Sequence, residues 1–240
     1  MQNRLLTGEP PVASALLFDV YGTLADTRGM ADAVAPLTGD VEQLAGSWRK
    51  HQLQISWLLT LLGSYEDFDA VTAYALEVAL AEAGLRTSED QRLEVLEGLD
   101  RLVVFDDVVP ALDSLAAAGH VLGVLSNGSP RALESLLSAA GIRDCFQHLI
   151  SADEVRAFKP VPSVYRRAAT RVGAPVGELW LVSANPFDAA GAKAAGMRVA
   201  QLERGPSFTY PFAVSPDLMI STLLDLPGAV RPVLTTEVVR

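Results

Sequence analysis

Short apolar runs alternate with amphipathic segments over most of the chain. Six runs have the length and composition of buried β-strands, and they cover residues 14–18, 120–125, 148–150, 178–182, 198–201 and 218–220. Four amphipathic segments between them are each followed by a glycine that can end a helix, and they cover residues 109–118, 131–140, 162–172 and 188–195. This alternation predicts a parallel, doubly wound α/β sheet.

Residues 27–105 follow a different pattern. They hold no convincing strand, and they contain three long helical segments at residues 41–62, 67–84 and 89–102. We therefore expect an all-helical cap over residues 27–105, inserted after the first strand. Residues 1–26 and 106–240 would together form the catalytic core.

Composition narrows the class of protein. The chain has 240 residues, of which 50% are hydrophobic and 20% are charged, as in a globular enzyme. Its net charge of −10 argues against a nucleic-acid partner or an anionic membrane, although a few local cations could still bind an anionic substrate. The single cysteine, Cys145, excludes an internal disulfide and fits a reducing compartment. With no signal peptide or membrane-spanning segment in the pattern, we expect a cytoplasmic protein.

Polar side chains follow four of the predicted strands. Because the carboxyl ends of parallel strands share one edge of the sheet, we expect these side chains to meet there. In chain order they are Asp19 and Thr23, Ser126 and Asn127, Lys159, and then Ser183, Asn185 and Asp188. A rigid, partly desolvated carboxylate can act as a nucleophile when it is ionised, and the ammonium group of Lys159 would favour the ionised form. Asp19 is therefore the candidate nucleophile.

Other catalytic arrangements do not fit the chain. His51, His120 and His148 lie outside the loops that follow the strands, and there is no G-x-S-x-G segment, so a Ser-His-Asp hydrolase is not expected. Glycine-rich loops of the kinds that bind nucleotide phosphates are also absent from the sequence.

Four segments, in order, resemble the motifs of the haloacid dehalogenase superfamily. They are Asp19-Val20-Tyr21-Gly22-Thr23-Leu24, Ser126-Asn127-Gly128, Lys159-Pro160, and residues 183–188. The cap segment Trp48-Arg49-Lys50-His51-Gln52-Leu53 narrows the resemblance to the L-2-haloacid dehalogenase branch. This resemblance implies a Rossmann-like core with a helical cap, no cofactor or metal, and a homodimer.

Position 21 separates two activities within the superfamily. Its phosphatases carry a second Asp two residues after the nucleophile, which protonates the leaving alcohol, whereas this chain has Tyr21. Halide is a good leaving group and needs no proton. The phosphatases also hold magnesium with an acidic pair in the last motif, and Ser183-Ala184-Asn185 supplies no such pair. Both departures favour dehalogenation.

The resemblance implies a two-step displacement that converts short (S)-2-haloacids to (R)-2-hydroxyacids and halide. Asp19 would attack C2 to form an ester, which water would then cleave. Whether fluoroacetate is also a substrate is left open, because no residue of the halide site decides for or against fluoride.

The resemblance also assigns roles to individual residues. Arg49 and Asn127 would line the halide site, with Phe187 as a wall. Ser126 and Lys159 would hold the substrate carboxylate, while Asp188, Ser183 and Asn185 would position or activate water. The remaining candidates are Thr23, which can bind the nucleophile carboxylate, Tyr21, Leu53 and Phe68 around the alkyl group, and Tyr165 as a further substrate contact.

Two alternatives stay open at this point. One is a phosphohydrolase of the same superfamily, which magnesium-dependent phosphate release would establish. The other is a non-catalytic binding protein with the same fold, which the presence of Asp19, Lys159 and Asp188 makes the weaker alternative.

Overall fold

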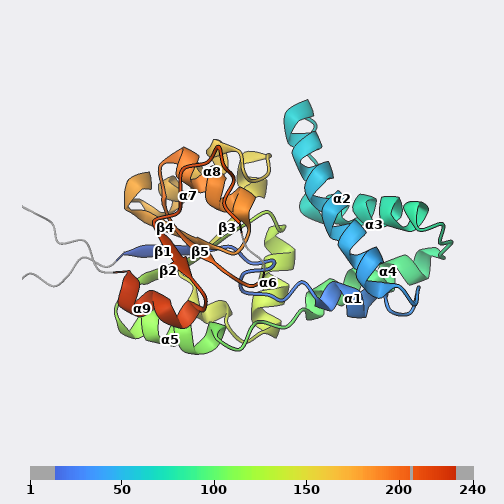
Figure 1. Cartoon of the computed structure of the whole chain (residues 1–240), viewed down its shortest axis with the longest axis horizontal. Helices are drawn as coiled ribbons and strands as arrows, with labels where there is room; N and C mark the ends of the chain where they lie inside the picture. The colour runs from blue at the N-terminus through green and yellow to red at the C-terminus, as the bar shows by residue number, and fades with distance from the viewer. Residues whose placement is uncertain (1–13, 206–207, 231–240) are drawn as a thin grey trace, which may run out of the picture.

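The core is a six-stranded parallel sheet with the strand order β3-β2-β1-β4-β5-β6 (Figure 1). The computed structural model describes residues 14–205 and 208–230. The strands are β1 (Ala15–Phe18), β2 (Val121–Ser126), β3 (His148–Ser151), β4 (Leu179–Ser183), β5 (Arg198–Leu202) and β6 (Leu218–Ile220). Each lies within one residue of a predicted strand, and the predicted doubly wound α/β fold is confirmed.

Helices cover both faces of the sheet and form a separate group beside it (Figure 1). They are α1 (Gly29–Val34), α2 (Val41–Leu62), α3 (Phe68–Glu82), α4 (Glu89–Gly98), α5 (Val108–Ala117), α6 (Pro130–Ala139), α7 (Pro162–Val172), α8 (Pro186–Ala195) and α9 (Leu226–Ala229). The short helices α1 and α9 were not expected from the sequence. Helix α3 ends at Glu82, α4 ends early and continues as the 3₁₀ turn Leu99–Arg101, and α8 begins at Pro186 because proline suits a first helical turn.

Alternate residues of the central strand β1 enter two different hydrophobic layers. Leu16 and Phe18 pack with α5, α6 and α9 on one face, whereas Leu17 packs with α7 and α8 on the other. All three side chains are at most 1% exposed. The sheet is therefore buried on both faces, as its continuous apolar strands predict.

Helices α1 to α4 form the cap around Trp48 of α2. Its indole ring is fully buried, and its Nε1 donates to the carbonyl oxygen of Thr72 in α3 at 2.9 Å. The two segments that connect the cap with the core pair with each other, since the N–H of Asp26 donates to the oxygen of Val103 and that of Phe105 donates to the oxygen of Leu24. This pairing supports the division at residues 27 and 105, which we retain as a proposal.

Arg204, directly after β5, joins both connecting segments to the core. Its guanidinium donates to the carbonyl oxygen of Thr23 at 3.0 and 3.2 Å and to both oxygens of Asp107 at 2.8 and 2.9 Å. It also lies over the ring of Phe105, 4.0 Å from the centroid. The side chains of Arg204 and Asp107 are about 15% exposed or less. If one of the two is lost, little water can therefore reach the other to replace the missing hydrogen bonds.

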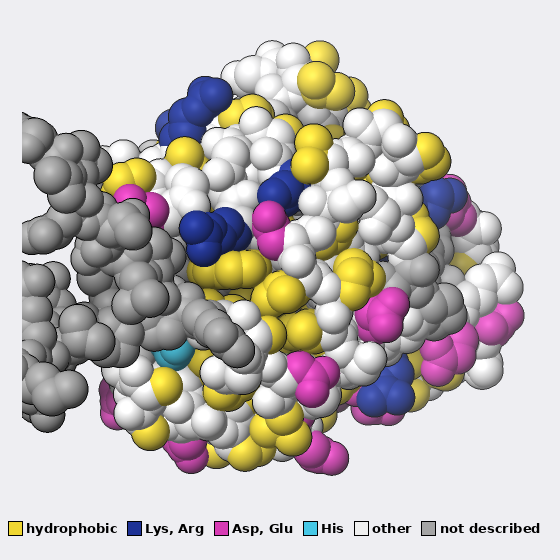
Figure 2. Space-filling model, turned by 60° about the vertical axis from the view of Figure 1, so that its left-hand side comes forward, with side chains coloured by type: hydrophobic (Ala, Val, Ile, Leu, Met, Phe, Trp, Pro, Cys, Tyr) yellow, Lys and Arg dark blue, Asp and Glu magenta, His cyan; other side chains and the backbone are white. Residues whose placement is uncertain are grey.

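The surface charges and the helix hydropathy of the described residues are those of a globular protein, as the composition indicates. On the described part of the left-hand face of the core, isolated Lys and Arg side chains lie among Asp and Glu side chains (Figure 2). Within residues 14–205 and 208–230, no helix has the length and apolar character needed to cross a bilayer.

We predict that Arg204→Met lowers the free energy of unfolding by about 3 kcal/mol, because it leaves the carboxylate of Asp107 without its buried cation. Denaturant unfolding followed by circular dichroism measures the change. Arg198→Met is the matched control: Arg198 lies on β5 and has only a 5.8 Å cation–π contact with Trp180, so its loss costs about 1 kcal/mol or less. Equal destabilisation by the two variants would contradict the role given to Arg204.

Candidate active site

The candidate residues meet where the strand order reverses. Asp19 follows β1, and Ser183 ends the neighbouring strand β4, so the helices after these two strands lie on opposite faces of the sheet. Such a reversal opens a crevice at the carboxyl ends of the strands. The cap segments α2 and α3 lie over this crevice and add Arg49 and Phe68 to its wall.

The two oxygens of the Asp19 carboxylate have different surroundings. Oδ2 accepts hydrogen bonds from Thr23 Oγ1 at 2.9 Å, Asn185 Nδ2 at 2.6 Å and Ser183 Oγ at 3.5 Å. Oδ1 accepts a hydrogen bond from Lys159 Nζ at 3.1 Å. The carboxylate is therefore held rigidly through Oδ2, and Oδ1 is the oxygen with a lone pair to spare.

The ammonium group of Lys159 lies between two buried carboxylates. It donates to Asp19 Oδ1, to Asp188 Oδ2 at 2.8 Å and to the carbonyl oxygen of Leu125 at 2.6 Å. An ammonium group has three N–H donors, and these partners use all three. A direct bond from Lys159 to a substrate carboxylate, as expected from the sequence, would therefore require the exchange of one of these partners.

Burial and charge act in opposite directions on this group of residues. Burial alone lowers the pKa of Lys159, but the nearby charges of Asp188 and Asp19 outweigh it, so the pKa is raised and the ammonium stays charged. Burial raises the pKa of Asp188 above its ordinary value, and the charge of Lys159 opposes that rise. Asp188 is thus a carboxylate with more than usual affinity for a proton.

Tyr165 lies behind Asp188 and not in the cavity wall, which differs from the substrate contact expected from the sequence. Its side chain is fully buried on α7, and its hydroxyl donates to Asp188 Oδ1 at 2.8 Å. Burial keeps its pKa well above the ordinary value, so the hydroxyl remains a donor. Tyr165 therefore positions Asp188 and does not reach a ligand.

Ten of the fourteen predicted site residues line one small cavity of about 10 Å³ between core and cap. They are Asp19, Tyr21, Arg49, Leu53, Phe68, Ser126, Asn127, Lys159, Asn185 and Phe187. The other four, Thr23, Ser183, Asp188 and Tyr165, are fully buried behind this wall. The structure thus brings the fourteen residues together and divides them into a lining and a supporting layer.

Arg49 and Asn127 both present donors to this cavity. Burial lowers the pKa of the Arg49 guanidinium, and the charge of Asp19 opposes that effect. The side-chain oxygen Oδ1 of Asn127 accepts a hydrogen bond from the backbone N–H of Lys159 at 2.8 Å, which leaves the side-chain Nδ2 of Asn127 as a donor. These are the groups that can stabilise an anion released beside Asp19.

The sequence did not identify two cap residues that hold this wall. Gln52 accepts a hydrogen bond from Arg49 Nη1 and donates to Thr72 Oγ1 at 2.7 Å. Its position three residues after Arg49 on α2 was the available signal, because such residues are neighbours on a helix. Trp57 donates to the carbonyl oxygen of Lys159 at 3.1 Å and packs edge-on against Phe187, contacts between distant segments that spacing does not reveal. Lys50, next to Arg49 on α2, is exposed and lies outside the wall.

The chain matches a family model and several curated proteins. A model of the haloacid dehalogenase-like hydrolases matches residues 13–196. This chain belongs to that family. Among curated proteins, the (S)-2-haloacid dehalogenase of Xanthobacter autotrophicus is 34% identical over 90% of this chain and 94% of its own length.

Solved structures of haloacid dehalogenases share the fold of this family member. The L-2-haloacid dehalogenase from Xanthobacter autotrophicus with chloropropionic acid covalently bound has a TM-score of 0.85 and 33% identity, over 90% of this chain and 98% of that one. A defluorinating L-2-haloacid dehalogenase has a TM-score of 0.79 and 29% identity, over 91% of this chain and 98% of that one. The resemblance stated from the motifs is confirmed.

We predict that Tyr165→Phe raises the pKa of Asp188 in this haloacid dehalogenase-like hydrolase by about one unit. The hydroxyl bonds the ionised carboxylate, and a hydrogen bond to a charged group contributes about 1.5 kcal/mol. Infrared titration of the carboxyl bands measures the pKa, and Asp188→Asn identifies the band.

Tyr65→Phe is the matched control, because Tyr65 donates to another carboxylate, Asp153, at 2.6 Å outside the site. That variant should leave the Asp188 band unchanged. An unchanged Asp188 titration in Tyr165→Phe would refute the positioning role.

Proposed function

We propose that this chain hydrolyses the carbon–halogen bond of short (S)-2-haloacids, giving (R)-2-hydroxyacids and halide through an ester on Asp19. The observation that carries the proposal is the environment of Asp19. Three donors fix Oδ2, a buried ammonium group lies at Oδ1, and position 21 holds a tyrosine instead of a second acid. The curated and solved relatives named above support the same reaction.

In the first step, Oδ1 of Asp19 attacks C2 on the face opposite the halogen. A bond forms between Oδ1 and C2 while the carbon–halogen bond breaks, and the halide departs with the bonding electrons, so C2 is inverted. Arg49 and Asn127 would receive the halide, with Phe187 closing that side. No proton is transferred, which is why Tyr21 can occupy the position of the phosphatase acid.

In the second step, water attacks Cγ of Asp19. Negative charge then develops on Oδ2, where Thr23, Asn185 and Ser183 already donate, so these residues form an oxyanion hole. Asp188 is the candidate base, because burial raises its pKa toward the range useful for proton transfer. The bond between Cγ and Oδ1 breaks, and Oδ1 leaves as the hydroxyl oxygen of the product with the proton that Asp188 took from the attacking water.

A superfamily phosphohydrolase is the second candidate, and the same residues argue against it. The last motif supplies Ser183 and Asn185 where an acidic pair would hold magnesium, and no acid follows Asp19 at position 21. No further observation favours this activity or a purely binding role.

We predict that Asp19→Asn abolishes halide release from (S)-2-chloropropionate in the presence of EDTA, since the amide cannot attack C2. Ion chromatography measures the halide. Asp153→Asn is the control, because that carboxylate lies outside the cavity and should leave turnover unchanged.

Single turnover in heavy-oxygen water should label Asp19 and not Asp188. Label in any other residue contradicts the ester, and no halide release by the wild-type chain contradicts the reaction.

We extend the proposal to fluoroacetate. The cavity of about 10 Å³ suits a small leaving group, and one structural relative is a defluorinating enzyme. Fluoride release from fluoroacetate in the same assay tests this extension separately.

We also propose that the chain is a cytoplasmic homodimer. An apolar groove of about 650 Å³ lies beside the site, and Trp57, Leu61, Phe187 and Phe212 are part of its lining. Leu61 is 85% exposed and Phe212 is 83% exposed in the single chain. Exposed apolar patches of this kind mark interfaces, and a second copy brings an identical patch under two-fold symmetry.

We predict that Leu61→Glu combined with Phe212→Glu gives a monomer, because both changes place charge in the proposed apolar interface. Light scattering coupled to size exclusion measures the mass. Leu224→Glu, at a leucine that is 53% exposed outside the groove, should leave the dimer intact. A wild-type chain that is monomeric at micromolar concentration would exclude the homodimer.

A further inference from the structure

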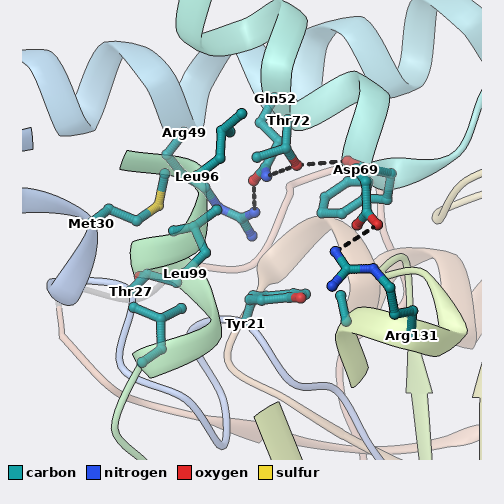
Figure 3. A pocket seen from close by; sticks show the side chains of 13 residues that line it. Tyr21, Thr27, Met30, Arg49, Gln52, Asp69, Thr72, Leu96, Leu99 and Arg131 are labelled. Carbon is teal, nitrogen blue, oxygen red and sulfur yellow. Dashed lines mark hydrogen bonds and ion pairs between the residues drawn. The ribbon is translucent and has the colours of Figure 1, made fainter. Parts of the chain in front are cut away.

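A second space lies beside the catalytic cavity, between α1, α2, α3 and α4 of the cap and the core (Figure 3). This cap–core chamber has a volume of about 170 Å³. Tyr21, Arg49 and Phe68 line both the chamber and the catalytic cavity, so the two spaces share a wall. The function proposed above leaves this chamber without a role.

The catalytic cavity alone limits the size of a substrate. Its volume of about 10 Å³ is about that of one water-sized group, whereas the volume of the chamber, about 170 Å³, is roughly seventeen times as large. A haloacid with more than a small group on C2 must therefore extend beyond the catalytic cavity. The chamber is the adjoining space on the side of Tyr21 and Phe68, whose rings lie 6.1 Å apart.

One side of the chamber is polar, and its polar groups bind one another. Gln52 connects Arg49 with Thr72, as described above (Figure 3). Asp69 of α3 accepts bonds from Ser129 at 3.0 Å and from Arg131 at 3.1 Å, which also ties the cap to α6 of the core. Each of these side chains thus has a partner within the protein, and Arg49 keeps further donors for the catalytic cavity.

The opposite side of the chamber is apolar. It is formed by Met30 of α1, Leu96 of α4, and Leu99 and Leu102 beyond the end of α4 (Figure 3). Met30 is 3% exposed and packs within the cap, and Leu102 is 6% exposed and packs in the hydrophobic layer of the core that contains Leu16 and Phe18. An alkyl chain is the ligand group that gains most from contact with such a wall.

We propose that the cap–core chamber is the subsite for the unbranched alkyl chain of longer 2-haloalkanoates, with about four to six carbons in total. This inference rests on the proposed dehalogenation and adds the substrate's chain length to it. The reacting carbon stays beside Asp19, and the chain passes Tyr21 and Phe68 to reach Met30 and Leu96. Each methylene buried there raises kcat/KM roughly fourfold, the equivalent of about 0.8 kcal/mol.

Leu96 offers a test in both directions. Leu96→Trp fills the chamber and should lower kcat/KM for bromide release from (S)-2-bromohexanoate by roughly tenfold or more, while (S)-2-bromopropionate changes less than about threefold. Leu96→Ala enlarges the chamber and should extend turnover to (S)-2-bromooctanoate. Leu93→Trp is the matched control, because Leu93 lies on the same helix, is 51% exposed and does not line the chamber.

Each other outcome overturns the subsite. An equal loss for both substrates in Leu96→Trp would make the chamber a passage for every substrate. Unchanged selectivity in both Leu96 variants would remove it from substrate binding. A wild-type chain that releases bromide from bromopropionate but not from bromohexanoate would contradict the subsite alone, whereas release from neither would contradict the proposed function itself.

Discussion

Lys159 holds a positive charge in a fully buried place, within 3.1 Å of Asp19 and 2.8 Å of Asp188. Two carboxylates so near each other would resist ionisation, and a buried ammonium alone would be strongly unfavourable. Together they stabilise one another, because each carboxylate raises the pKa of Lys159 and its charge opposes the rise in the pKa of Asp188. Removal of Lys159 would leave two buried carboxylates without the cation between them, so the three groups depend on one another.

The position of Lys159 also connects the core with the cap. Its N–H is bound by Asn127 after β2, and its carbonyl oxygen is bound by Trp57 of α2. The same cap helix brings Arg49 to the cavity. Counted as formal charges, Asp19 and Asp188 balance Lys159 and Arg49, so an anionic ligand enters a site that is neutral although the whole chain has a charge of −10.

The sequence predicted the sheet well because buried parallel strands are continuous apolar runs, and it predicted the cavity because residues after such strands meet at one edge. The sequence did not predict contacts between segments that are far apart in the chain. Tyr165 lies on the face of α7 that packs against Asp188, and Arg204, in the loop after β5, donates to the carbonyl oxygen of Thr23. Neither contact leaves a spacing in the sequence, and α1 is too short, at six residues, to show helical periodicity.

Tyr21 affects both the chemistry beside Asp19 and the shape of the two spaces that it lines. An acid at this position, needed to protonate an alcohol, would be a further charge beside Asp19 and would require water or a cation. A tyrosine instead pairs its ring with Phe68 and forms part of the wall between the catalytic cavity and the cap–core chamber. The same substitution that removes the proton donor thus supplies an apolar surface for the substituent on C2. In the proposed reaction, the choice of leaving group and the chain length of the substrate would therefore both depend on Tyr21.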